Sequence, residues 1–359
     1  MDKRKIIEEI YLFTTYSSRI DKLKESIDTN IHNENILQNL EILIKISKKQ
    51  ELSNNEIESI SDKKDNFSEF LLLYYTFNKQ GFFQNPNNNV WKLFFNAIFY
   101  FENNYKKAFD LLKKILEIDP QFLPALFFYG IKRNEYKQCK IAAEYLTKFY
   151  TLITFNLLKQ KSGIHLSRLN LFCNKYDEAI KYAELAEQHI HSSLSLYNLS
   201  FIHYSLKDII TAEKYLFESV NLYESNRNLN MLGWYYFDRL DYKKAEIYFK
   251  KIIDKKTSSF LPIFRFYEIM NNKDLLNMYI KLSIEKQGYN FINEAFYIFT
   301  AKDINERRLL KEKYLKKYGI YNWFEEETEF LLLNKKRIFR IKNNYEWPWY
   351  FEMYIRDRI

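Results

Sequence analysis

Alanine recurs in this chain at a fixed interval, and that interval constrains the fold more than any other feature. Ala179, Ala212 and Ala245 are spaced 33 residues apart. In the last copy, Phe249 and Ile252 follow the alanine at steps of four and three, which places all three side chains on one face of a helix. Because a single helix cannot bury such a face, the recurrence predicts a stack in which each copy covers its neighbour.

The last copy also shows the internal layout of the unit. Between residues 228 and 254, two apolar-patterned segments of helix length flank a short polar turn at 238–241. This arrangement predicts an antiparallel helix pair. In the first segment Gly233 follows Leu232 and has no Cβ, so we expect the two helices to cross closely there.

Similar steps occur in earlier parts of the chain. The matching sets are Ile209, Ala212, Leu216 and Ser219; Tyr176, Ala179, Ala183 and Ala186; and Tyr105, Ala108, Leu112 and Ile115. Pro120 follows the earliest set, where it would lie just beyond the end of a second helix. A further copy around Tyr136 and Cys139 has irregular spacing. The sequence therefore predicts several helix pairs in tandem.

These positions resemble the tetratricopeptide repeat family, whose unit of about 34 residues forms two helices. The resemblance rests on Leu232-Gly233, on the Tyr-x-x-Ala steps and on Pro120, and it covers about residues 88–258. Trp91 departs from the family pattern, since it lies about one position from the usual first-helix tryptophan. The resemblance implies an all-α fold, an α-solenoid in which antiparallel helix pairs stack into a right-handed superhelix, with helical N- and C-terminal extensions.

The composition along the chain predicts four segments. Residues 1–89 contain further helix-like stretches, which would be degenerate repeats or a helical cap, and they end in a turn-rich loop at 78–89. Residues 90–258 hold the repeat array. Residues 259–320 continue the helical pattern, with Gly288 and Gly319 where helices would end. Residues 321–359 are aromatic and basic without a helical period, and we expect them to cap the array.

Composition and charge narrow the class of protein further. Only 6 Gly and 5 Pro in 359 residues argue against a turn-rich β fold. The net charge of +9 allows an acidic partner, but a lysine-rich composition gives such a charge without one, so nucleic acid is not favoured. No apolar run reaches the length of a membrane span, so any membrane contact would be peripheral.

The start of the chain and its two cysteines bear on the compartment. Glu8 and Glu9 interrupt the apolar stretch near the start, which argues against a secretory signal. Cys139 and Cys173 are far apart in sequence and near packing positions of the repeats, so we interpret them as small buried side chains in a reducing compartment. We therefore expect a cytoplasmic protein.

The family resemblance implies that first helices line a concave groove. The side chains that would face this groove are Arg168, Tyr197, Phe201, Tyr204, Arg227, Asn230, Trp234 and Phe237. Aromatic and arginine side chains are often the energetically central ones at interfaces, so the set could anchor an extended or helical peptide. The alternative is that the C-terminal helices of the chain itself fill the groove.

Motifs for catalysis are absent from the sequence. It has no Gly-rich phosphate loop, no GxSxG, no CxxC and no HExxH, so we predict no catalytic residues and no cofactor. His189 and His191 are the only close histidine pair, and at a spacing of two their side chains diverge on a helix, so we predict no metal site.

These observations favour a non-enzymatic scaffold or adaptor that binds a protein or peptide partner in the groove, within a larger assembly that could be membrane-associated or motor-like. One alternative is a regulator of the same repeat class that responds to a ligand or a peptide. A second alternative is a basic adaptor for nucleic acid or an anionic membrane surface, which would bind with a steep dependence on salt.

Overall fold

Helices make up all the regular secondary structure in the described part of this computed structural model, which confirms the all-α prediction. The described residues are 3–16, 34–63, 65–101, 104–132, 139–254, 260–288, 291–300 and 303–318. Gly319, Tyr136 and the expected cap at 321–359 lie outside these ranges. The chain divides into unit 1, Met1–Ala212, and unit 2, Glu213–Ile359.

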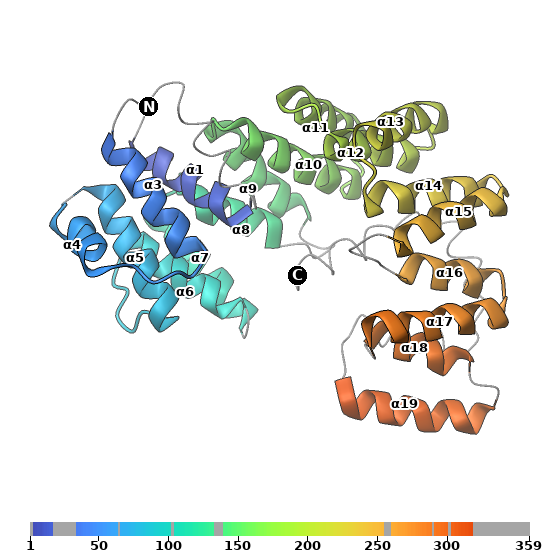
Figure 1. Cartoon of the computed structure of the whole chain (residues 1–359). Helices are drawn as coiled ribbons and strands as arrows, with labels where there is room; N and C mark the ends of the chain where they lie inside the picture. Colours follow the sequence, from blue (N-terminus) through green and yellow to red (C-terminus); the bar gives the residue numbers. More distant parts are fainter. Residues whose placement is uncertain are drawn as a thin grey trace. The chain divides into compact units, whose positions relative to one another are not determined.

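Unit 1 begins with a separate helix and continues as helices that follow one another closely (Figure 1). Its helices are α1 (Lys3–Tyr16), α3 (Glu34–Ser47), α4 (Asn54–Asp62), α5 (Asn66–Gln80), α6 (Val90–Tyr100), α7 (Tyr105–Ile118), α8 (Leu123–Lys132), α9 (Cys139–Leu152), α10 (Asn156–Phe172), α11 (Tyr176–His189) and α12 (Ser193–Ser205). The boundary between the units falls within α13 (Ile209–Leu222).

Unit 2 continues with the same kind of element. Its helices are α14 (Asn226–Asp238), α15 (Tyr242–Ile253), α16 (Leu261–Ile269), α17 (Lys273–Gln287), α18 (Phe291–Thr300) and α19 (Ile304–Tyr318). Consecutive helices pack as pairs in both units: α6 with α7, α8 with α9, α10 with α11, α14 with α15, α16 with α17, and α18 with α19. The fold is a tandem array of antiparallel helix pairs of the tetratricopeptide type, as the sequence predicts.

Small side chains lie where the helices of a pair cross. Ala179 and Ala245 are fully buried, and Ala212 is almost so. A Cβ on Gly233 of α14 would lie 2.2 Å from the ring of Phe249 on α15, so a side chain there would displace that ring. Gly130 of α8 faces the second helix of its pair in the same way. The predicted close crossing is confirmed.

One part of the repeat pattern is arranged differently from the prediction. Tyr105 and Tyr176 are 54% and 48% exposed, although the sequence pattern placed them on the buried face with the alanines. Each is the first residue of a second helix, at the rim of its pair, where the neighbouring helix does not cover it. The alanine three residues later is fully buried in both helices.

The turns inside the pairs share an unusual backbone conformation. Asn174, Lys207 and Leu240, again 33 residues apart, all have positive φ angles of 58°, 66° and 64°. The Leu240 N–H donates to the Phe237 carbonyl at 2.9 Å, and the next N–H reaches back to the Tyr236 carbonyl at 3.0 Å. This left-handed ending closes the first helix, although the chain places no glycine there.

Leu240→Gly should therefore stabilise unit 2. Leu240 is 71% exposed and loses little packing on removal, whereas its left-handed conformation is costly for a residue with a Cβ. We expect the free energy of unfolding, measured by urea titration, to rise by about 0.5–1 kcal/mol.

Leu309→Gly is the matched control, since Leu309 is 55% exposed but lies in the interior of α19. There the same change should destabilise by about 1 kcal/mol. A Leu240→Gly protein that loses stability as Leu309→Gly does would contradict the backbone explanation.

Candidate functional site

The first helices of unit 1 form a surface that another helix of the chain covers. Helix α1 packs against α3, α5, α8 and α10, and in Figure 1 it lies between α3 on one side and α8 and α10 on the other. We call the surface that α5, α6, α8 and α10 present to α1 the α1 site. Three of these helices, α6, α8 and α10, are each the first helix of a pair. This is the kind of surface on which the resemblance predicts ligand binding.

Aromatic rings surround Tyr11 at one end of the α1 site. Five rings have centroids 5.5–6.0 Å from the Tyr11 centroid, each with its plane at 79–89° to the Tyr11 ring. They come from α5 and α6 and belong to Phe70, Tyr74, Trp91, Phe94 and Phe95. Such edge-to-face contacts are favourable beyond simple burial of area. Tyr11 is 4% exposed and acts as an anchor for α1.

Two consecutive glutamates of α1 bind the beginnings of two different helices. Glu8 Oε2 accepts a hydrogen bond from the Leu123 N–H at 2.8 Å, at the start of α8. Glu9 accepts from the Thr154 N–H at 2.9 Å and from the Phe155 N–H at 2.8 Å, just before α10. The first N–H groups of a helix have no partner within the helix and carry its positive dipole end, so a carboxylate suits them.

The α10 end depends on this contact because it cannot cap itself. Its N-cap residue is Phe155, whose side chain offers no hydrogen-bond acceptor. Thr154 also donates its hydroxyl to Glu9, at 2.9 Å. Glu9 thus binds the N–H groups of the N-cap residue and of the residue before it, at the start of a helix that has no side-chain cap.

Burial raises the pKa of the Glu9 carboxyl above its ordinary value. Hydrogen bonds from Phe155 and Thr154 and the charge of Lys159 lower the pKa, but they do not fully offset the loss of solvent. Directed hydrogen bonds from Phe155 and Thr154 therefore stabilise the ionised carboxylate more than the charge of Lys159 does.

In the sequence alone, Glu8 and Glu9 have a different interpretation. There they served only as an interruption of an apolar stretch, whereas the structure shows them 2% exposed and bonded to residues more than a hundred positions away. A pair of adjacent acids flanked by isoleucines was the available signal. It could not indicate which helices they reach.

The predicted groove residues of unit 1 are mostly buried. Arg168, Tyr197 and Phe201 are 6%, 4% and 4% exposed, and Tyr204 is half-buried. Arg168 Nε donates to Asn198 Oδ1 at 2.8 Å, and its guanidinium carbon lies 5.8 Å from the centre of the Phe201 ring. These side chains link α10 to α12.

The predicted groove residues of unit 2 all lie on α14 and are partly exposed: Arg227, Asn230, Trp234 and Phe237. The Trp234 ring packs against Phe237 at 5.4 Å and Phe249 at 5.0 Å between centroids, which fixes its orientation. The Oδ1 atom of Asn230 is buried and accepts no hydrogen bond from the described residues. A tryptophan of fixed orientation on a partly exposed helix face suits contact with a peptide.

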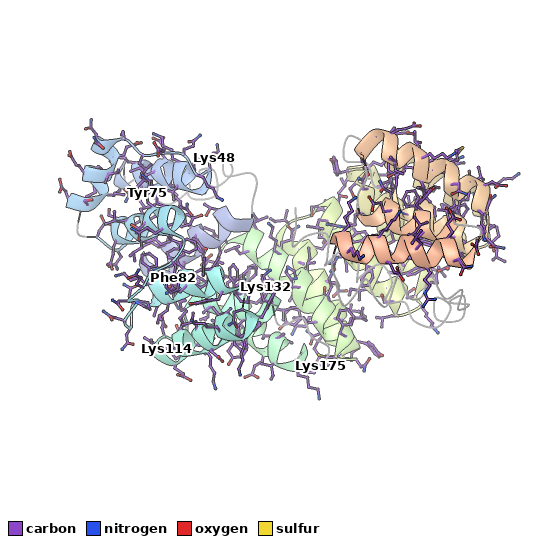
Figure 2. The ribbon with its side chains drawn as sticks, turned by 90° about the horizontal axis from the view of Figure 1, so that it is seen from below. Lys48, Tyr75, Phe82, Lys114, Lys132 and Lys175 are labelled. Carbon is purple, nitrogen blue, oxygen red and sulfur yellow. The ribbon has the colours of Figure 1, made fainter. Side chains whose placement is uncertain are left out.

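The described ranges hold fewer features of a metal site or a membrane-spanning segment. No three His, Cys, Asp or Glu side chains are placed there to hold a metal ion. None of the helices described is both long and apolar enough to cross a membrane. Lysines such as Lys114 and Lys175 project outward from unit 1 (Figure 2) and are exposed. In the alternative, the C-terminal part of the chain fills the groove. Residues 319–359 of that part lie outside the described ranges.

Comparison with known proteins gives structural likeness only. No family model and no curated protein matches the chain. Among solved structures it is similar to MamA, with 21% identity over 42% of this chain and 88% of that one, at a TM-score of 0.36. It is also similar to a Rap protein complexed with Competence and Sporulation Factor, with 14% identity, 90% and 98% coverage and a TM-score of 0.42.

A third structure, the Rap conjugation gene regulator of the plasmid pLS20 in complex with the Phr* peptide, shares 13% identity over 94% of this chain and 96% of that one, with a TM-score of 0.41. TM-scores below 0.5 assign neither a ligand nor a role to this chain. Its own helix pairs show the fold, a tandem array of antiparallel helix pairs similar to that of tetratricopeptide repeats.

Glu9→Ala should lower the stability of unit 1. It leaves the Thr154 and Phe155 N–H groups without their acceptor, and because Thr154 is exposed and Phe155 half-buried, each loss lies near the lower end of the range of about 1–3 kcal/mol typical of buried groups. The substitution also removes the cost of burying the Glu9 carboxylate, which offsets part of this loss. We therefore expect the free energy of unfolding, measured by urea titration, to fall by about 1–3 kcal/mol.

Glu117→Ala, at an exposed position of α7, is the matched control and should change stability by less than about 0.5 kcal/mol. Equal effects of the two substitutions would show that Glu9 does not cap α10.

Proposed function

We propose that this protein is a non-enzymatic scaffold that binds a protein or peptide partner through the first helices of its pairs. The observation that carries the proposal is the seat of α1 on such a surface within unit 1. A helix far away in sequence is held there by directed hydrogen bonds and an aromatic anchor. The surface of first helices thus has the chemistry needed to hold a peptide segment.

In unit 2 the partly exposed set on α14 is the proposed contact surface for the partner. Trp234 would supply a rigid apolar anchor, and Arg227 a charged group. Asn230 would add a polar contact through its partly exposed side chain. Such a set favours a segment that presents an apolar side chain next to polar groups.

Asn230→Ala separates binding from folding. The substitution removes an acceptor that makes no hydrogen bond within the described chain, so the free energy of unfolding should stay within about 0.5 kcal/mol. Partner capture from a native lysate, followed by crosslinking and mass spectrometry on the full chain, should weaken roughly three- to tenfold. Trp234→Ala should weaken capture by more than about tenfold.

Tyr248→Ala provides a control, since Tyr248 is a half-buried aromatic on the second helix α15. Capture should persist in that variant. A partner that is retained by Asn230→Ala and Trp234→Ala alike removes α14 from the account. Capture that instead falls steeply between 50 and 200 mM salt would favour the basic adaptor over the scaffold.

A further inference from the structure

We infer that the α1 site is a receptor for helical segments supplied in trans, and that α1 is its intramolecular occupant. The segment that fits carries two consecutive glutamates followed two residues later by a tyrosine. This inference deepens the proposed function, on which it rests, by naming a second binding surface and the chemistry of the partner that displaces α1.

The first argument is the position of α1 in the chain. Its hydrogen bonds from Leu123 and from Thr154 and Phe155 join residues 115, 145 and 146 positions apart. None of these contacts depends on the chain being continuous between donor and acceptor. An equivalent helix from another molecule could make every one of them.

The second argument is the chemistry that the site presents to its occupant. At one end it offers the first N–H groups of α8 and α10, with Lys159 near the carboxylate of Glu9. At the other end it offers the ring set around Tyr11. A helix with two acids, as at Glu8 and Glu9, and an aromatic residue, as at Tyr11, satisfies both ends. A purely apolar helix would leave the N–H groups without acceptors.

The geometry of α1 explains why the two acids must be adjacent. Neighbouring positions on a helix point about 100° apart. Glu8 and Glu9 therefore reach two different helices, α8 and α10, from the same turn. Tyr11 lies three positions after Glu8, on the same side of α1, and enters the ring set. The order Glu-Glu-x-Tyr thus encodes the recognition.

The burial of α1 sets how exchange must occur. All six residues from Ile7 to Leu12 are 7% exposed or less, so α1 is enclosed on every side that it presents in this stretch. A competing segment can enter only when α1 leaves as a whole. Weakening the hydrogen bonds of α1 should therefore open the site to an added helix.

The test uses the full chain and a fluorescent synthetic peptide with the sequence of residues 3–16. Fluorescence anisotropy should show that the peptide binds a Glu8→Ala, Glu9→Ala chain at least tenfold more tightly than the wild-type chain, after overnight incubation. A peptide carrying the same two substitutions should bind neither chain. Light scattering in the same samples reports the oligomeric state.

Variants of the hydroxyl donor to Glu9 sharpen the result. Thr154→Val removes the hydroxyl donor to Glu9 but keeps the N–H, and it should weaken peptide binding about three- to tenfold. Thr151→Val changes an exposed threonine of α9 and should leave binding unchanged. Equal affinity of the peptide for both threonine variants would contradict the assigned hydroxyl donor.

Each remaining outcome decides the inference. A folded double variant, checked by circular dichroism, that binds no peptide shows α1 to be a permanent part of the core and overturns the proposal. If the double variant does not fold, the same criterion applies to Glu9→Gln. A mixture of the double variant with the wild-type chain can also form a dimer in which the wild-type copy supplies α1. Dissociation of that dimer by excess peptide supports the site.

The outcome is independent of the surface on α14. A negative peptide titration beside intact partner capture through Trp234 removes the receptor site and leaves the scaffold function standing. Loss of both removes the proposed function itself.

Discussion

Close contact between the two helices of each pair is the constraint on which this structure depends. At the crossing of α14 and α15 the Phe249 ring occupies the space that a Cβ on Gly233 would need. Ala245 and Ala179 serve the same purpose from second helices and are completely buried. Because interiors are packed as densely as crystals, these few small side chains set how near the helices approach and therefore how neighbouring pairs stack.

The sequence could predict what is encoded locally. The alanine interval, the glycine at the crossing and the polar turn at 238–241 all describe contacts within one helix pair, and each of them is confirmed. The exposure of Tyr105 could not be read in the same way, since it depends on where a neighbouring helix ends. The helical period predicts on which face of a helix a residue lies, but it does not predict whether a neighbouring helix buries that residue.

Long-range placement is what the sequence could not supply. Neither the burial of Arg168 between α10 and α12 nor the role of Glu9 follows from spacing, because each depends on elements that meet only in the folded chain. The predicted site residues on α14 remain partly exposed, whereas the corresponding residues of unit 1 are mostly enclosed. Their part in binding remains a prediction.

The position of α1 also has a consequence for synthesis of the protein. The ribosome releases α1 well before its partners Thr154 and Phe155, which follow nearly 150 residues later, and at about 5–20 residues per second the delay is roughly 7–30 s. During that interval Ile10, Tyr11 and Leu12 have no complete site to enter. For this interval the nascent chain therefore carries an apolar helix without its packing surface, and such exposed surface is prone to aggregation.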